Sequence, residues 1–166
     1  MPRSGDEKAF TELMITLEKD MYKIARTRFN DINDIEEVVQ ETMIQAFKSI
    51  KKIKDSKKFK NWLFKILINK SNLLYKKKKQ TIEYKNSMER DWYYSTENID
   101  SRLDFMYLIK DLNYDEKITI TLFYLEDFTS SEIAKILKES ESTIRNRLSR
   151  ARRKIKENME GDLVNG

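Results

Sequence analysis

Apolar residues recur every three or four positions along most of the chain, which predicts helices rather than strands. The predicted helices cover about residues 6–29, 34–53, 59–79, 103–113 and 115–125. A turn rich in Asn and Asp separates the first two, and Asn33 can cap the helix that follows it. The pattern therefore predicts an all-α fold.

Residues 129–156 carry the most specific pattern, two further helices joined by a tight turn. Thr129 and Glu132 have the spacing of a capping box, which predicts a helix start. The small residue Ala134 lets a second helix approach closely, as a helix-turn-helix requires. The second helix can begin after Ser140, and its apolar stripe consists of Ile144, Leu148, Ala151 and Ile155.

The remaining faces of this last helix are basic. No acid occurs between Ile144 and Lys156, where Arg and Lys occupy most positions outside the apolar stripe. Such a helix can contact a core with one side and the major groove of DNA with the other. We therefore interpret it as a recognition helix in preference to a solvated basic helix that closes a bundle.

The predicted helix at residues 59–79 has a second informative surface. Its inward face is predicted to consist of Phe59, Trp62, Leu63, Ile66, Leu67, the stem of Lys70, Leu73 and Leu74. Its other face carries Lys60, Asn61, Lys65, Asn69, Asn72 and Lys76 through Lys79. Cations can follow a nucleic-acid backbone and amides can read base edges, so this face is suited to a single strand. The final lysines also have a structural explanation, because a helix C-terminus favours positive charge.

Composition narrows the chemistry. The 166 residues include no Cys and no His, which excludes thiol nucleophiles, disulfides and Cys/His zinc sites. The three glycines and the single proline lie in the terminal segments, so no Gly-rich phosphate loop can form between them. A net charge of +5 favours an acidic partner such as nucleic acid. No apolar run is long enough to cross a membrane, and we expect a cytoplasmic protein.

The helical pattern stops between Gln80 and Asp100, and the charge there reverses to five acids against two bases. We interpret this segment as a linker between two small helical domains. Its aromatic cluster, Trp92 to Tyr94, is unusual for a linker and predicts contact with the chain itself or with a partner.

The order of these parts resembles a bacterial sigma factor of RNA polymerase, most of all the small extracytoplasmic-function (ECF) class. The resemblance rests on DIEEVVQETMIQAF and FKNWLFKILINKSNLLYKKKK in the first half, and on LFYLEDFTSSEIAKILKESESTIRNRLSRARRKI in the second. It implies a sigma region 2-like domain over residues 6–79, an acidic linker over 80–102 and a region 4-like helix-turn-helix domain over 103–158.

The resemblance also implies roles for individual residues. Those that would dock on the clamp helices of the polymerase largest subunit are Glu37, Gln40 and Glu41. Those that would hold the minus-ten strand, with one base flipped out, are Lys54, Asp55, Ser56, Lys57, Lys60, Asn61, Lys65 and Asn69. Those that would meet the minus-thirty-five element in the major groove are Arg145, Asn146, Arg147, Ser149, Arg150 and Arg153.

The implied partners are core RNA polymerase, through its clamp helices and flap, promoter DNA and an anti-sigma factor, which in this family is often membrane-bound. The resemblance implies no cofactor, no metal, no small-molecule substrate and no catalysis. This sequence departs from the family pattern at the turn of the helix-turn-helix, where the family commonly has Gly, an apolar residue and a second Gly. This chain has Lys138, Glu139 and Ser142 instead, so one residue must adopt an uncommon backbone conformation.

Two other functions fit parts of the pattern. A stand-alone helix-turn-helix regulator would bind a palindromic site as a homodimer, whereas a sigma factor would bind an asymmetric site as a monomer. An enzyme is a distant third hypothesis, because no spacing suggests an acid–base pair.

Overall fold

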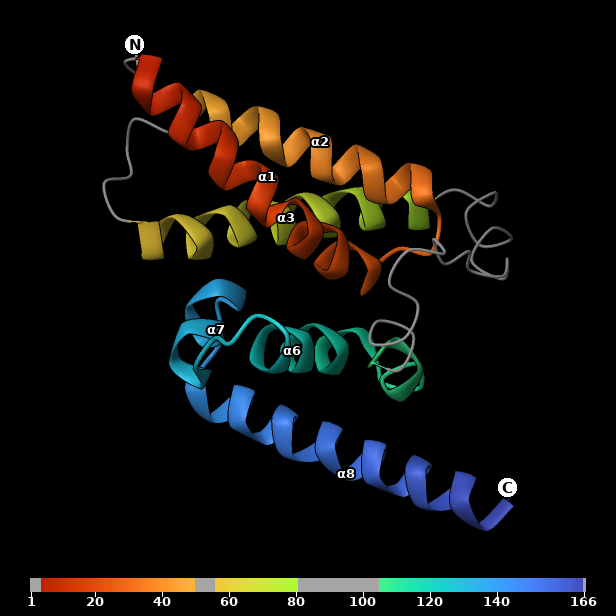
Figure 1. Ribbon diagram of the computed structural model, residues 1–166. Helices are drawn as coiled ribbons and strands as arrows, with labels where there is room; N and C mark the ends of the chain where they lie inside the picture. Colours follow the sequence, from red (N-terminus) through yellow and green to blue (C-terminus); the bar gives the residue numbers. More distant parts are fainter. Residues whose placement is uncertain (1–3, 50–55, 81–104, 166) are drawn as a thin grey trace. The chain divides into compact units, whose positions relative to one another are not determined.

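The computed structural model describes the backbone of residues 4–49, 56–80 and 105–165 (Figure 1). All regular elements in these ranges are helices, which confirms the predicted all-α class. The chain separates into two compact units, Met1–Asp91 and Trp92–Gly166. The predicted linker with Trp92 to Tyr94 lies outside the described residues, as do Lys54 and Asp55.

The first unit is a bundle of three helices. Its elements are α1 (Ser4–Arg26), α2 (Ile32–Ser49) and α3 (Ser56–Lys79), and each packs against the other two. Fully buried side chains from all three form the core, among them Met21, Ile24, Ile35, Leu63 and Leu67. Phe10 of α1 meets Phe47 of α2 and Phe59 of α3 edge to face, with ring centroids 5.7 and 5.9 Å apart.

The start of α2 differs from the prediction. The helix begins at Ile32, so Asn33 lies inside its first turn and is not the cap. The carboxylate of Asp31 accepts a hydrogen bond from the backbone N–H of Asn33 at 2.9 Å, and the Asp31 carbonyl accepts from Ile35 at 3.1 Å. Asp31 therefore satisfies the helix start, because its position one residue before α2 lets both oxygens face the free N–H groups.

The buried face of α3 is wider than predicted and ends earlier. Phe64 and Ile68 are 0% and 3% exposed although they were not assigned to the inward face, whereas Leu73 is 67% exposed. Because α3 contacts both α1 and α2, side chains on two adjoining stripes of it are buried.

The second unit consists of α6 (Tyr114–Tyr124), α7 (Ser130–Leu137) and α8 (Glu141–Asn165). The helix expected at residues 103–113 is helical only at 105–108 within the described range. It stops there because Asn113 begins the next helix: its side chain accepts from the Glu116 N–H at 2.9 Å, and its own N–H donates to the Glu116 carboxylate at 3.1 Å. The core of the unit includes Ile118, Leu122 and Ile133.

The helix-turn-helix forms as predicted from α7 and α8. The Thr129–Glu132 capping box is present, with hydrogen bonds of 3.1 and 3.0 Å. Lys138 ends α7 in the left-handed region at φ 57°, which is the uncommon conformation that the missing glycine requires. The Ser140 hydroxyl accepts from the Thr143 N–H at 3.2 Å and so starts α8.

Candidate nucleic-acid interface

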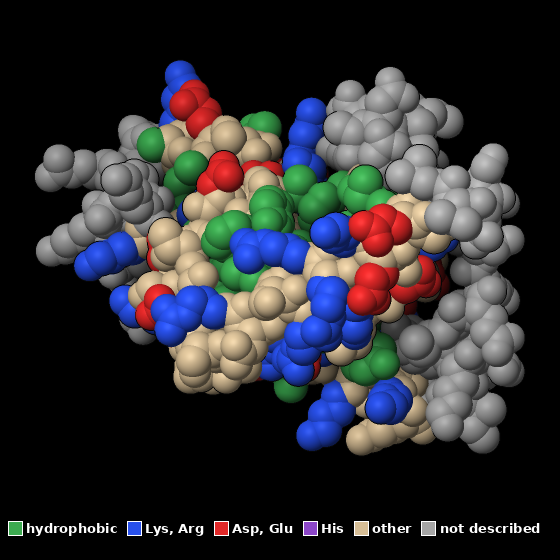
Figure 2. Space-filling view, turned by 90° about the horizontal axis from the view of Figure 1, so that it is seen from below, with side chains coloured by type: hydrophobic (Ala, Val, Ile, Leu, Met, Phe, Trp, Pro, Cys, Tyr) green, Lys and Arg blue, Asp and Glu red, His purple; other side chains and the backbone are tan. Residues whose placement is uncertain are grey.

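The basic side of α8 is open to solvent along the residues that were predicted to contact DNA. Ile144, Leu148 and Ala151 fix the opposite side in the core, each at most 2% exposed. The exposed members of the predicted set are Arg145, Asn146, Ser149, Arg150 and Arg153. Figure 2 looks at the molecule from below the view of Figure 1, and Lys and Arg side chains gather on the face it shows. These five side chains therefore share one anchored helix that can enter a major groove.

Arg147 has a different environment from the other predicted contacts. Its side chain is 12% exposed, and its guanidinium lies 2.5 Å from the Glu139 carboxylate and 3.8 Å from that of Asp115. Its Nη1 atom is buried without a hydrogen-bond partner. Arg147 thus links α8 to the turn and to α6, and its charge is directed inward.

Two more basic residues of α8 are tied to α6. The Nε of Arg152 donates to the Tyr124 hydroxyl at 2.6 Å, and Lys154 donates to the buried Glu116 carboxylate at 2.8 Å. Burial raises the pKa of Glu116, but hydrogen bonds from Lys154 and Asn113 outweigh it, and the pKa lies below its ordinary value. The sequence did not predict the contacts of Arg152 and Lys154 with α6. It did contain the Asn-x-x-Glu spacing of the capping box at the start of α6.

The predicted strand-binding residues of α3 lie between its first residue and just past its middle, at Asn69. Lys60, Asn61 and Lys65 are half-buried and Asn69 is exposed. The Lys60 ammonium lies 5.6 Å from the centre of the Phe64 ring. The side chains of Ser56 and Lys57 lie outside the described residues, with the loop before them.

The predicted polymerase-docking residues share one exposed face of α2. Glu37, Gln40 and Glu41 are exposed, and the same face continues to Ile44, which is 56% exposed. Ile44 also borders an open apolar groove of about 480 Å³ between α1 and α2. The other apolar residues that line this groove are Phe10, Met14, Ile15, Met43 and Phe47. An exposed polar row beside an apolar groove is suited to a protein partner.

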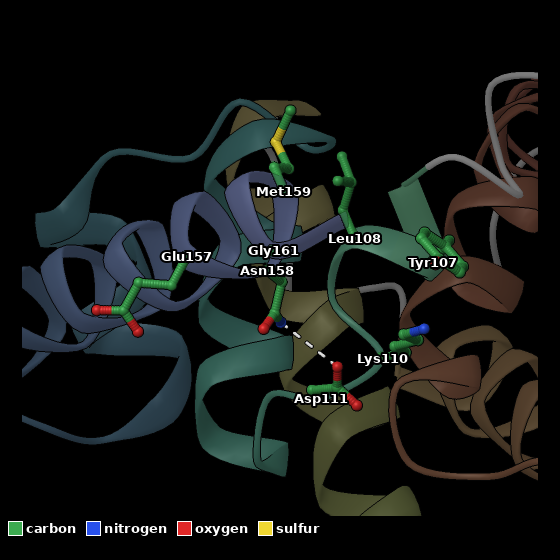
Figure 3. Close-up of a pocket in the computed structure, with 8 residues that line it drawn as sticks. All are labelled: Tyr107, Leu108, Lys110, Asp111, Glu157, Asn158, Met159 and Gly161. Atoms are coloured by element: carbon green, nitrogen blue, oxygen red, sulfur yellow. Dashed lines mark hydrogen bonds between the residues drawn. The ribbon is translucent and has the colours of Figure 1, made fainter. Parts of the chain in front are cut away.

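A smaller pocket of about 190 Å³ lies where the end of α8 meets residues 107–111 (Figure 3). Asn158 donates to Asp111 at 3.4 Å, and the Lys110 ammonium lies 3.9 Å from the centre of the Tyr107 ring. Glu157 points away from these side chains. Asn158 is eight residues beyond Arg150, so the pocket is about 12 Å along α8 from the predicted DNA contacts. No group of possible metal ligands occurs among the described residues, and none of their helices could span a bilayer.

Both halves of the chain match the sigma factors of bacterial RNA polymerase. The family described as Sigma-70 region 2 matches residues 13–81, and Sigma-70, region 4, matches residues 102–155. The chain is 30% identical to the RNA polymerase sigma factor SigV of Bacillus subtilis over 159 residues, covering 91% of this chain and 92% of that protein. It is also 30% identical to the ECF RNA polymerase sigma-E factor of Haemophilus influenzae, covering 92% of this chain and 88% of that one.

The fold is similar to those of two solved proteins, the first of which is a sigma factor by name. One is RpoE of Bartonella quintana in complex with the anti-sigma factor NepR, with a TM-score of 0.71 and 23% identity over 92% of this chain and 98% of that one. The other is CnrH in complex with the cytosolic domain of CnrY, with a TM-score of 0.68 and 22% identity over 96% and 92%. The chain belongs to the sigma factor family. Within it, the protein is an ECF sigma factor that directs promoter recognition in transcription initiation, and not a stand-alone regulator.

Proposed function

We propose that this sigma factor places polymerase on a promoter through three surfaces: the exposed side of α8, the polar face of α3 and the exposed row on α2. The observation that carries the proposal is the division of α8 into a buried apolar side and an exposed side with Arg145, Asn146, Ser149, Arg150 and Arg153. That division lets one helix be held rigidly by its own domain while its polar side chains reach base edges.

The exposed side of α8 reads the minus-thirty-five element. Arg145 and Arg150 can form bidentate contacts to guanine, and Asn146 can do so to adenine. Arg153 supplies a phosphate contact further along the helix. Arg147 links α8 to the turn through Glu139 and to α6 through Asp115, so its contribution is to aim the helix.

The polar face of α3 receives the minus-ten strand. Lys60 and Lys65 follow its phosphates, and Asn61 and Asn69 offer amides to unpaired bases. Lys54, Asp55, Ser56 and Lys57 precede this face along the chain, and their proposed role is to hold a base flipped out of the duplex. Flipping the base costs a few kcal/mol. Contacts to the flipped base and contacts to polymerase offset this cost, and melting starts at that base.

The exposed row on α2 binds the polymerase largest subunit. Glu37, Gln40 and Glu41 supply polar contacts, and Ile44 supplies an apolar one beside them. The chain contributes binding and positioning and no catalytic group, and it acts in the cytoplasm where polymerase meets DNA. Because both solved relatives are complexes, one with an anti-sigma factor by name, an anti-sigma partner for this chain is part of the proposal.

In vitro transcription with bacterial core polymerase tests the proposal. Fragmented DNA of the source genome is the template, and transcript starts are mapped by sequencing. We expect discrete starts that share two upstream elements and that decrease at least tenfold with Arg150→Ala or Asn69→Ala. Lys19→Ala, an exposed change on α1, is the matched control and should keep the starts. Absence of starts with the unaltered chain, despite a stable complex with core, would contradict the proposal.

A further inference from the structure

The guanidinium of Arg152 on α8 rests against two aromatic side chains of α6. It lies 5.3 Å from the centre of the Phe123 ring and 5.5 Å from that of Tyr124. Both distances are within the range of a cation–π contact, and the Nε of Arg152 also donates to the Tyr124 hydroxyl at 2.6 Å. The two rings meet edge to face, with centroids 5.0 Å apart. The guanidinium is therefore fixed in place before any ligand binds.

These contacts leave most hydrogen-bond donors of Arg152 and Tyr124 available. Both residues are exposed, and a guanidinium has five N–H donors, of which the contact with Tyr124 uses only the one on Nε. The Tyr124 hydroxyl accepts that bond through a lone pair, so its own proton can be donated to another group. Among the described residues, the ion pairs of α8 are formed by Arg145, Arg147 and Lys154 and not by Arg152. The charge of Arg152 therefore remains available to an anion.

Arg152 lies on the same stripe of α8 as two residues that are proposed to read the minus-thirty-five element. A step of four residues leads from Arg145 to Ser149, and a step of three leads from Ser149 to Arg152. Such steps stay on one face of a helix, and together they place Arg152 about 10 Å along α8 from Arg145. The major groove of B-DNA is about 12 Å wide. A helix that brings Arg145 to base edges would therefore bring Arg152 to the backbone that borders the groove.

The chemistry of Arg152 and Tyr124 matches a phosphate group. Arginine binds phosphate through two parallel N–H donors, and tyrosine hydroxyls are among the groups that contact DNA phosphates. Because Arg152 is already fixed by the rings, it loses little conformational freedom on binding. Tyr and Arg are also common in protein interfaces. However, no acid occurs in α8 from Ile144 to Lys156, and this uniform positive charge favours DNA.

We propose that Arg152 and Tyr124 together hold one phosphate of the DNA backbone beside the minus-thirty-five element. The inference rests on the proposed function, in which Arg145 and Arg150 read bases of that element. Arg152 supplies the charge and paired N–H donors, Tyr124 supplies a neutral O–H donor, and Phe123 supports the guanidinium from α6. Because the contact is to the backbone, it fixes the orientation of α8 in the groove without reading a base.

Promoter binding by the holoenzyme at several salt concentrations tests this contact. The probe is a promoter fragment mapped with the unaltered chain. Further copies each carry one neutral methylphosphonate, at successive phosphates beside the minus-thirty-five element. The variants are Arg152→Gln and Tyr124→Phe, and the second removes only a hydroxyl. Lys19→Gln, at an exposed lysine of α1, is the control for charge, and Tyr107→Phe, at an exposed tyrosine of the second unit, is the control for the hydroxyl.

Arg152→Gln should reduce the magnitude of the slope of log K against log salt by about 0.9, which is the contribution of one phosphate contact. Tyr124→Phe should weaken binding about tenfold and keep the slope, because the donor that is lost is neutral. At one methylphosphonate position the unaltered chain should bind more weakly, and there Arg152→Gln should cause no further loss. Both controls should bind like the unaltered chain.

The phosphate contact is overturned if Arg152→Gln keeps the slope, or if its effect persists on every modified fragment. It is also overturned if Arg152→Gln weakens binding of the chain to core polymerase measured without DNA, because Arg152 would then contact protein. In each of these cases the proposed function stands as long as Arg150→Ala lowers promoter binding. If Arg150→Ala also binds like the unaltered chain, the proposed role of α8 fails as well.

Discussion

At the scale of single residues, environment separates arginines that look equivalent in the sequence. Arg145 and Arg147 lie two positions apart in the same basic helix. Arg145 is exposed, and its ion pair with Glu141 at 3.0 Å has both side chains about half exposed. Arg147 is nearly buried between Glu139 and Asp115. The two residues should therefore affect different properties of the protein.

Arg147→Ala should destabilise the second unit, and Arg145→Ala should not. Removing the Arg147 side chain takes away the partner that the Glu139 and Asp115 carboxylates share, which should lower the free energy of unfolding by about 1–2 kcal/mol. Removing Arg145 breaks an exposed pair worth less than about 0.5 kcal/mol. Thermal unfolding should show a decrease in Tm of about 4–15 °C for Arg147→Ala and little change for Arg145→Ala. Equal Tm values for the two variants would mean that the inward contacts of Arg147 contribute nothing to the fold.

At the scale of helices, the caps and buried faces determine what the sequence could predict. The Thr129–Glu132 box, the start of α8 after Ser140 and the apolar stripe of α8 were predictable because they depend on residues within one turn. The exposure of Leu73 and the Asp34–Lys78 pair were not, because they depend on helices that meet from distant parts of the chain. The inward direction of Arg147 was missed for the same reason.

The candidate site also has one part that local spacing predicts and one part that it does not. Local spacing predicted a basic face on α8, and the structure shows which of its members are exposed. Assignment to particular promoter elements came from the resemblance and stays a prediction, because an isolated chain contains no DNA against which a contact could be measured.

The contact between Lys154 of α8 and Glu116 of α6 should make the stability of the second unit decrease at acid pH. Burial raises the pKa of Glu116 and the Lys154 and Asn113 hydrogen bonds lower it, with a net decrease. The pKa of Glu116 is therefore lower in the folded protein than in the unfolded chain. The stability that this carboxylate contributes is complete above its ordinary pKa of ~4.3 and is lost as the pH falls through its pKa in the folded protein.

Lys154→Gln should therefore reduce stability by about 1 kcal/mol at pH 7, and the difference from the unaltered chain should shrink below about pH 4. Thermal unfolding between pH 7 and pH 3 measures this. Lys156→Gln removes an exposed charge two residues further along α8 and serves as the control. A difference that stays constant over the whole range would assign the effect to packing of the lysine stem instead.

At the scale of the whole molecule, the two small DNA-binding surfaces that we propose for this chain imply weak binding without polymerase. Each proposed surface is basic, and without polymerase it should bind duplex DNA mainly through non-specific phosphate contacts, for which dissociation constants are about 10⁻⁴–10⁻⁶ M at physiological salt. Fluorescence anisotropy should therefore show weak, steeply salt-dependent binding of the free chain to duplex DNA, and gel filtration should show a monomer. A nanomolar complex that tolerates salt, or a dimer on a palindromic site, would contradict this expectation.

We propose that one chain uses α8 on the upstream element and α3 on the downstream element of the same promoter. The most direct measurement combines changes in the protein with changes in the DNA. Transcription with core polymerase is measured for Arg150→Ala and for Asn69→Ala, each on the intact promoter and on promoters in which one of the two elements is scrambled. We expect Arg150→Ala to have almost no further effect once the upstream element is scrambled, and Asn69→Ala almost none once the downstream element is scrambled. The effects of the two crossed pairs should be additive. Full additivity in every pair, or the reverse pairing, would contradict it.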